Sequence, residues 1–176
     1  MSVTDLEVRQ EDEGKPALPP LVHAHELTRG GPVIEKGSLR VRCTLVNHPL
    51  IRTAFAYRFD GPDRSIVISG DTTRSANLID LARGADVLVH EVLYAPAVDA
   101  IAGTGADAAR LKQHILASHT PLAEVGKIAA EAGVKTLVLS HFVPTETPPV
   151  SDETWLQGAR EHFAGQVILG RDLMEI

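Results

Sequence analysis

The sequence predicts an α/β fold in which helices pack on a sheet. Three runs of β-branched and aliphatic residues predict strands buried on both faces: SIVISGDTTRS at 65–75, DVLVHEVLY at 86–94 and KTLVLSHFVP at 135–144. Helical patterns separate these runs, and this alternation of strands and helices is typical of helices packed on a sheet. Each run also ends in a side chain that can bind a metal ion, so the fold and the candidate site are predicted together.

The first residues differ in composition from the rest of the chain. Residues 1–20 combine an acidic cluster with three prolines, which predicts an extended lead-in with little regular structure. Residues 21–27 fit a short strand. We therefore expect a lead-in over residues 1–20 and a single domain over residues 21–176.

An antiparallel meander is expected before the first of the three runs. Leu39–Asn47 alternates and is rich in β-forming residues, and Thr53–Phe59 follows as a second strand. Gly61-Pro62-Asp63 then makes a turn into the strand 65–69.

The remaining elements follow from periodicity and from glycine and proline. Helices are predicted at Ser75–Arg83, Asp107–Leu116, Pro121–Ala132 and Asp152–Phe163. The third helix has the clearest apolar face, and Gly133 ends it. Residues 95–105 contain a proline and two glycines and predict a loop. Short strands are expected at Gln166–Leu169 and Leu173–Ile176.

Composition narrows the class of protein. The 176 residues suffice for one domain with a sizeable core, and no apolar run approaches the roughly 18 residues of a membrane span. The polar, acidic N-terminus is no signal peptide, so we expect a cytoplasmic protein. Cys43 is the only cysteine, which excludes an internal disulfide. The net charge of −6 disfavours broad electrostatic capture of nucleic acid, so nucleic acid is not an expected partner.

Polar side chains gather where the predicted strands end. Asp71, the pair His90-Glu91 and His141 end the three runs, His48 ends an earlier one, and His119 directly precedes a helix. Taken singly, such an aspartate is often a helix N-cap, and such a histidine is often a core residue. Together they predict a metal site at the edge of the sheet, where active sites collect. Carboxylate and imidazole ligands suit Zn²⁺, Mn²⁺ or Fe²⁺.

These residues also resemble the motifs of a known family. From residue 21 to residue 176 the chain resembles the C-terminal portion of a metallo-β-lactamase-fold hydrolase, in the branch that holds ribonuclease Z and the arylsulfatase-like hydrolases. The matching segments are VNHPLIRTAFAYRF, SGDT, LVHEVLY and ASHTPLAEVGKIAAEAGVKTLVLSHFVP. LVHEVLY matches a His-Glu-Ala-Thr motif, from which Val92 and Leu93 depart. The resemblance implies an αββα sandwich, represented mainly by its C-terminal half.

The resemblance also implies a role for each residue. His48 is expected to ligate a first metal, His141 a second, and Asp71 to bridge both. His119 is expected to protonate or stabilise the leaving oxygen of the scissile ester, with Glu91 orienting it. The expected catalytic residues are therefore His119 and Glu91, and the expected cofactor is Zn²⁺, or else Mn²⁺ or Fe²⁺.

One motif of the family does not occur in this sequence. The family carries His-x-His-x-Asp-His upstream of the position of His48, and His23-Ala24-His25-Glu26 lacks the Asp-His pair of that motif. We therefore expect partial metal occupancy or none, and a sheet face left without cover. A homo-oligomer or a complementing N-terminal half would provide that cover. Whether the chain is an active enzyme stays open at this point.

The function implied is hydrolysis of a phosphodiester, sulfate or similar anionic ester. The short span from His48 to Asp71 favours an arylsulfatase-like enzyme with a small anionic ester as its substrate. One alternative is an enzyme like the tRNA 3′-processing endonuclease. A second alternative is a catalytically inactive binding or oligomerisation module of the same fold, because fold does not dictate function.

Overall fold

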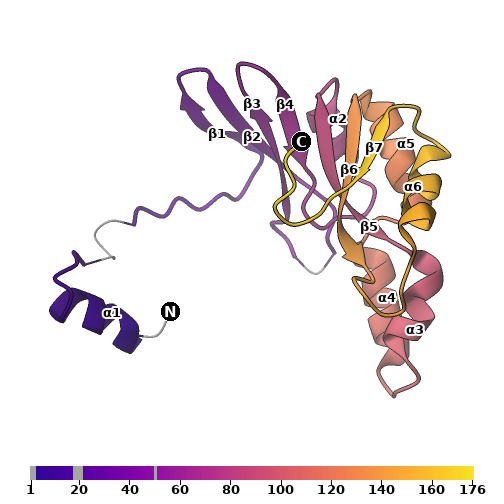
Figure 1. The fold of residues 1–176 in the computed structure, drawn as a ribbon, viewed down its shortest axis with the longest axis horizontal. Helices are drawn as coiled ribbons and strands as arrows, with labels where there is room; N and C mark the ends of the chain where they lie inside the picture. Colours follow the sequence, from indigo (N-terminus) through magenta and orange to yellow (C-terminus); the bar gives the residue numbers. More distant parts are fainter. Residues whose placement is uncertain (1–2, 18–21, 50) are drawn as a thin grey trace.

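Figure 1 shows the fold in the computed structural model, which describes residues 3–17, 22–49 and 51–176. Within these residues, seven strands form one sheet whose order follows the chain. The strands are β1 (Gly31–Lys36), β2 (Leu39–Leu45), β3 (Phe55–Asp60), β4 (Ser65–Ile68), β5 (Val87–Leu93), β6 (Thr136–Val143) and β7 (Gln166–Leu169). Strands β2 to β4 pair antiparallel, as the meander predicts, β1 also pairs antiparallel with β2, and β4 to β7 pair parallel.

The helices fall into three groups. α2 (Ala76–Ala82), α5 (Leu122–Ala132) and α6 (Asp152–Arg160) cover one face of the sheet, whereas α3 (Val98–Ala102) and α4 (Ala108–Ser118) lie beyond the carboxyl end of β5 (Figure 1). A short 3-10 turn, Ala95–Ala97, precedes α3, and α1 (Val3–Glu11) belongs to the N-terminal segment. Among the residues described, no helix combines the length and apolarity that a membrane crossing requires.

Local signals in the sequence set the helix boundaries. The hydroxyl of Ser75 accepts the N–H of Leu78 and caps α2, and Ser151 caps α6 in the same way. α5 ends at Gly133, whose φ of 65° is the left-handed conformation expected of a glycine C-cap. A side chain at Gly126 would overlap the carbonyl oxygen of Ala159, so glycine is needed where α5 crosses α6.

The main core lies between the sheet and these three helices. Its buried members on the strands are Val67, Leu88, Val92, Leu137, Leu139 and Val167, and those on the helices include Leu78, Val125, Ile128, Ala129 and Trp155. Burying each large aliphatic side chain contributes roughly 1.5–3 kcal/mol. This core holds the strands in register, and the register decides which residues meet at the carboxyl edge of the sheet.

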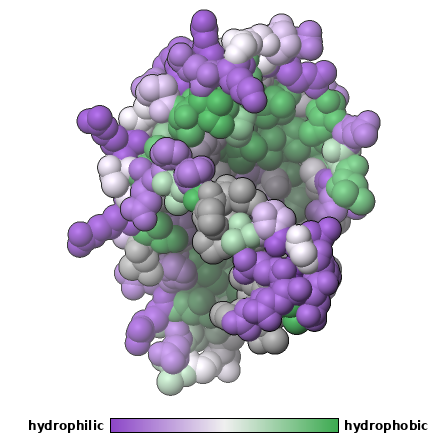
Figure 2. Space-filling view, turned by 90° about the vertical axis from the view of Figure 1, so that its left-hand side faces the viewer, coloured by the Kyte–Doolittle hydropathy of each residue, from purple (hydrophilic) through white to green (hydrophobic). Residues whose placement is uncertain are grey.

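The opposite face of the sheet is apolar, and no helix of the described residues packs on it (Figure 1). Strand register aligns Tyr57, Ile68, Val89, Val138 and Ile168 in one row across it, and we call this surface the open face. Ile68 is 44% exposed. Figure 2 looks at the molecule from the left of Figure 1 and shows hydrophobic surface bordered by hydrophilic residues. An αββα sandwich places its second sheet on such a face, so one sheet with helices on one side is the expected half.

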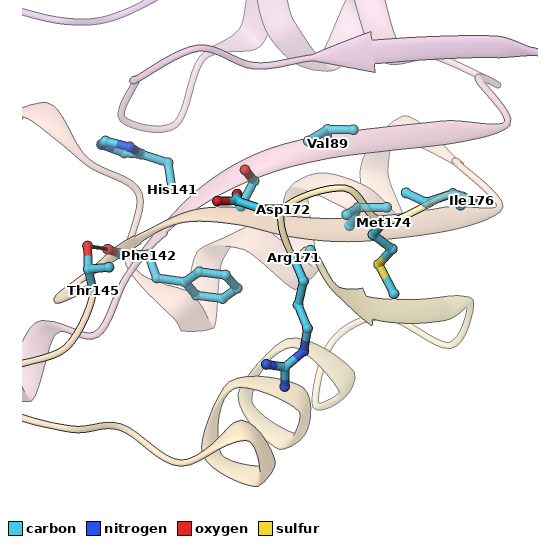
Figure 3. Close-up of a pocket in the computed structure, with 11 residues that line it drawn as sticks. Val89, His141, Phe142, Thr145, Arg171, Asp172, Met174 and Ile176 are labelled. Carbon is cyan, nitrogen blue, oxygen red and sulfur yellow. Dashed lines mark hydrogen bonds between the residues drawn. The ribbon is translucent and has the colours of Figure 1, made fainter.

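The C-terminal residues lie partly over the open face. A cavity of about 440 Å³ lies between Val89 and Val138 of the sheet and Met174 and Ile176 of the C-terminal segment (Figure 3). His141 also lines this cavity. The open face therefore extends to the edge of the sheet at which the polar residues gather.

In the N-terminal third, two expectations are wrong and one strand was not predicted. Residues 3–11 form helix α1 rather than extended chain, because the prolines and glycine that disfavour helix come only after them. Residues 22–27 form no strand, and residue 21 lies outside the described residues. β1 was not expected, because most of its side chains are exposed at the sheet edge and give no apolar alternation.

The C-terminal half departs from expectation at three places. Residues 98–102 form the single helical turn α3 inside the expected loop. α6 ends at Arg160, before the predicted Phe163. Residues 173–176 form no strand, since Leu173 adopts a left-handed φ of 63° that breaks extended chain.

Candidate functional site

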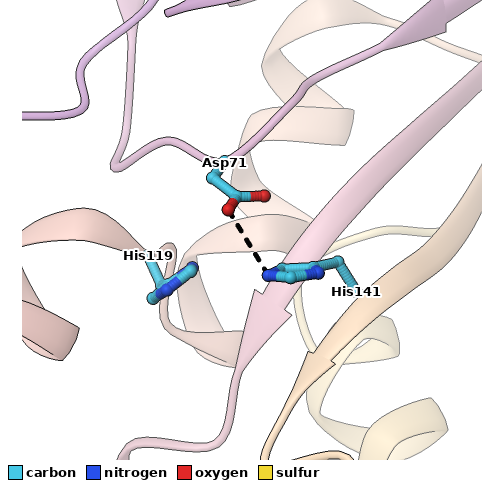
Figure 4. Close-up of side chains that lie close together, drawn as sticks. All are labelled: Asp71, His119 and His141. Atoms are coloured by element: carbon cyan, nitrogen blue, oxygen red, sulfur yellow. Dashed lines mark ion pairs between the residues drawn. The ribbon is translucent and has the colours of Figure 1, made fainter. Parts of the chain in front are cut away.

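Three potential metal ligands meet at the carboxyl edge of the sheet. Asp71 follows β4, His119 ends α4 and His141 lies in β6, and their ligand atoms all lie within 4.8 Å of one another (Figure 4). Asp71 Oδ2 is 3.4 Å from His141 Nε2. Asp71 is not the N-cap of α2, because Ser75 holds that position. The carboxylate of Asp71 is therefore not engaged in capping and faces the two imidazoles.

A β-bulge places His141 in this cluster. Glu91 pairs with Ser140 and Val92 pairs with Phe142, so His141 is an extra residue between two paired ones. Its φ of 43° lies in the left-handed region, which is unusual for a residue with a side chain. Strained backbone of this kind is concentrated at functional sites, because it costs stability and persists only where surrounding structure enforces it.

A buried carboxylate fixes the ring of His119. Glu91 is only 2% exposed, and its Oε2 lies 3.2 Å from His119 Nδ1. Its Oε1 accepts the backbone N–H of Thr120 at 2.5 Å. The hydrogen bond to Glu91 is the main cause that raises the pKa of His119 above its ordinary value, against an opposing effect of burial. With Nδ1 engaged, Nε2 is the nitrogen left for a metal or a substrate.

Two buried threonines tie together the loops that carry these residues. Thr72, which is fully buried, accepts the backbone N–H of Asn47 at 3.0 Å through Oγ1. Its carbonyl oxygen accepts the hydroxyl of Thr120 at 2.6 Å. The loops of His48, Asp71 and His119 are thereby connected directly, and the site does not depend on long flexible loops for its shape.

His48 lies next to the cluster but not in it. Its ring centroid is 6.5 Å from that of His119 and 6.3 Å from that of His114. Nδ1 of His48 is buried and has no hydrogen-bond partner among the described residues. A buried nitrogen without a partner costs free energy, and Nε2 of the fully buried His90 is in the same state. The structure thus groups His119 with Asp71 and His141, where the sequence predicted His48.

The second histidine at a strand end has a different environment. His90 is fully buried, and its Nδ1 donates to the carbonyl oxygen of Glu91 at 2.6 Å. Burial lowers the pKa of His90, so the ring is neutral. His23 and His25 are exposed and take part in no potential metal cluster of the described residues.

The donor set fits one divalent metal ion. Asp71 and His141 supply a carboxylate oxygen and an imidazole nitrogen, and a second imidazole, from His119 or from the neighbouring His48, would complete the three protein ligands of a catalytic zinc site, which keeps a further position for water or substrate. The open nitrogen of His48 is a fourth potential donor nearby. Carboxylate and imidazole are also ligands for Mn²⁺ and Fe²⁺.

Sequence reasoning missed several residues around the site. No role at the site was predicted for Thr72, Thr120, Asn47 or His114. The useful signal for the threonines was their position directly after Asp71 and His119. No sequence signal identifies His114, because its position depends on where α4 packs.

The sequence of the chain matches one family model and several curated relatives. A family model described as the Beta-lactamase superfamily domain matches residues 3–142. Ribonuclease Z of Mycobacterium tuberculosis (strain H37Rv) is 32% identical over 158 residues, covering 90% of this chain and 55% of the relative. Ribonuclease Z of Mycobacterium avium is 35% identical over the same length, covering 90% and 54%. The chain therefore spans about half the length of these relatives.

Solved structures share the fold at lower identity. A metallo-beta-lactamase fold protein from Bacillus subtilis superposes with a TM-score of 0.58 at 21% identity, covering 80% of this chain and 50% of that one. Human tRNase Z, short form, gives a TM-score of 0.54 at 20% identity, covering 84% and 45%. At this identity the likeness establishes the fold alone.

The relatives correct one expectation from the sequence. Net charge favoured a small anionic ester as substrate and argued against nucleic acid as a partner, but the curated relatives are ribonucleases by name. The expectation is wrong because a net charge of −6 is a sum over the whole chain. Contact with a phosphate backbone depends on the few cationic groups that lie near the site.

Proposed function

Because the chain belongs to the beta-lactamase superfamily, we propose that it carries the centre of a metal-dependent hydrolase that cleaves phosphodiester bonds in RNA. The observation that carries this proposal is the meeting of Asp71, His119 and His141 at one edge, with Glu91 buried behind His119. The ribonuclease Z relatives support RNA as the substrate class. A structured RNA such as a tRNA precursor is the substrate that fits these relatives best.

Asp71 and His141 would hold a divalent metal ion, with His48 as a further ligand. Zn²⁺ and Mn²⁺ both suit this set of one carboxylate and two imidazoles. When bound, the ion would polarise the phosphate and make water a better nucleophile at neutral pH. The imidazole of His141 is held at the site by its bulge, and the loop of Asp71 is held by Thr72.

His119 would donate a proton to the leaving oxygen. Glu91 selects the ring orientation through Nδ1 and stabilises the cationic imidazole, which leaves Nε2–H as the donor. The N–H of Thr120 holds the second oxygen of Glu91, so the carboxylate cannot rotate away. His119 and Glu91 would thus form a proton-donating pair, and Asp71 would hold the metal ion.

The proposal is tested by separating metal binding from turnover. The purified chain, loaded with Mn²⁺ or Zn²⁺, is incubated with a labelled tRNA precursor. Asp71→Ala is expected to lose metal and cleavage together. His119→Ala is expected to keep its metal while cleavage falls by roughly 10²–10⁴-fold, the usual contribution of general acid catalysis. His162→Ala, an exposed histidine outside the cluster, serves as the control.

Two outcomes would contradict parts of the proposal. If His119→Ala removes the metal as fully as Asp71→Ala does, His119 is a ligand and its role as proton donor is wrong. If the metal-loaded chain leaves the RNA intact, RNA hydrolysis by this centre is wrong.

A further inference from the structure

We propose that a groove along α4 binds the RNA nucleotide next to the scissile phosphate, an inference that rests on the proposed function. The groove is a cavity of about 350 Å³ lined by Pro49, Arg110, Gln113, His114, Ala117 and Ser118. A second cavity of about 440 Å³, which Arg110 and His114 also line, continues it past Arg110. We call this pair of cavities the α4 groove.

The α4 groove begins beside the candidate catalytic residues. Ser118 at its floor directly precedes His119, and His114 in its wall packs edge-on against His48 at 6.3 Å between ring centroids. The ring of His48 in turn packs against that of His119 at 6.5 Å. An RNA chain whose phosphate lies at Asp71 and His119 would therefore pass His48 and reach the groove within one nucleotide.

One side of α4 presents polar side chains where a packed helix would present apolar ones. Arg110, Gln113, His114 and Ala117 have the spacing i, i+3, i+4 and i+7 of a single helical stripe. The first three are exposed, whereas Ile115 on another side of α4 is buried in the small core of this region. The residues of this stripe do not pack into a hydrophobic core. They form one wall of a cavity instead.

The chemistry of the stripe matches a nucleotide. The imidazole of His114 and the ring of Pro49 offer flat surfaces on which a base can stack. The amide of Gln113 can both donate to and accept from a base edge. Ser118 Oγ lies 3.4 Å from His114 Nδ1 and is buried, so it restrains the ring from below.

Arg110 is available for a phosphate. Its ion pair is with Asp107 at 3.6 Å, and the two side chains are 87% and 86% exposed. An exposed pair of this kind contributes little to stability, so a phosphate oxygen can replace the carboxylate of Asp107 at small cost. Phosphate contacts from arginine set the register of an RNA chain, and stacked bases then fill the adjacent apolar wall.

Binding to an RNA hairpin with a single-stranded 3′ tail tests the α4 groove. The affinity of the full chain is measured by fluorescence anisotropy at several salt concentrations. His114→Ala is expected to weaken binding about 5-fold or more, as loss of a stacking ring does, and His114→Phe is expected to retain it. Arg110→Ala is expected to reduce the slope of log affinity against log salt by about one. Arg83→Ala is the matched control, because its exposed pair with Asp80 has the same spacing.

Abasic substitutions in the RNA tail locate the stacked base. Removing the base that occupies the groove should weaken binding by the wild-type chain but leave binding by His114→Ala unchanged, since the two changes remove the same contact. If the wild type binds and cleaves RNA but Arg110→Ala and His114→Ala behave like Arg83→Ala, the groove is wrong and the proposed function stands. If the wild type neither binds nor cleaves RNA, the proposed function fails and the groove fails with it.

Discussion

Each end of the parallel strands carries an aspartate, and the two aspartates have different surroundings. At the amino ends, Asp86 Oδ2 accepts the backbone N–H and the hydroxyl of Ser65 at 2.7 and 2.9 Å, and Oδ1 accepts Lys135 Nζ at 2.6 Å. At the carboxyl ends, Asp71 faces His141 Nε2 at 3.4 Å. Lys135, and then Ser65, hold the pKa of Asp86 well below its usual range.

The difference lies in how many donors each carboxylate already has. The carboxylate of Asp86 accepts hydrogen bonds from Ser65 at the start of β4 and from Lys135 just before β6, and it therefore links three strands. With both oxygens already bonded, Asp86 has few lone pairs available for a ligand. Asp71 has two imidazole rings beside it, and a carboxylate grouped with imidazoles is an arrangement that suits a divalent cation. An aspartate at a strand end is thus structural or functional according to the donors that its neighbours provide.

The largest expected effect separates the two aspartates by metal affinity. Asp71→Ala should weaken binding of Mn²⁺ or Zn²⁺ at least about 100-fold, because loss of even an indirect partner of a metal costs roughly 10–100-fold. Asp86→Ala should leave the affinity unchanged. Isothermal titration of both variants, with folding checked by circular dichroism, provides the measurement. Equal weakening by the two substitutions would remove the distinction.

A second prediction compares the buried Thr72 at the carboxyl ends of the strands with the half-buried Thr136 at their amino ends. Thr72→Val leaves the backbone N–H of Asn47 without its partner and should lower the free energy of unfolding by about 1–3 kcal/mol. Thr136→Val, whose hydroxyl lies 3.5 Å from Gln166 in an exposed contact, should change it by less than about 0.5 kcal/mol. Urea unfolding measures both. A cost at residue 136 as large as that at residue 72 would contradict the expectation.

A third prediction concerns the backbone at the metal-facing end. Because His141 has a φ of 43°, His141→Gly should be more stable than His141→Ala by about 1 kcal/mol. At the neighbouring Ser140, which shows no such φ, glycine should be less stable than alanine by about 0.5–1 kcal/mol. The order of the four unfolding midpoints in urea tests this. The same order at both positions would show that residue 141 carries no strain.

The smallest effect is expected in the pH dependence of the amino end. Since folding lowers the pKa of Asp86, its contribution to stability is fully present above about pH 4 and is lost as the pH falls below that value. Asp86→Asn should therefore be less stable than the wild type at pH 6, and the difference should shrink in more acidic buffer. A difference that stays constant from pH 6 to the acid transition would contradict the assigned role of Asp86.

Sequence patterns predicted those strands and helices of the fold that have a buried apolar face. β5 and β6 are runs in which most aliphatic residues are buried, and α5 has a full apolar stripe with a glycine stop. β4 is buried on its helix side only, at Val67, so the expectation that it is buried on both faces is wrong. β1 lies at the edge of the sheet and α3 is a single turn. Neither has enough buried side chains to produce a periodic apolar pattern in the sequence. Propensity and pattern are informative only where burial constrains the residues.

The sequence indicated which residues form the candidate site, but not which of them lie close together. Asp71, His119, His141 and Glu91 were all identified from strand ends and from family motifs. The bulge at residue 141 and the hydrogen bonds of Thr72 depend on pairing between distant segments, which no local pattern encodes. The cluster therefore contains His119 in the place expected for His48, and the α4 groove was not foreseen.

The bulge in β6 has a consequence for how this strand can change in evolution. Because His141 is inserted into the pairing, Phe142 returns to the helix side, where its ring packs 5.1 Å from that of Trp155. Deletion of one residue there would restore regular alternation, remove an imidazole from the edge and turn Phe142 toward the open face. Substitutions can alter the ligand without moving the aromatic anchor, but single-residue insertions and deletions cannot. Residues 137–143 should therefore diverge among descendants by replacement at constant length.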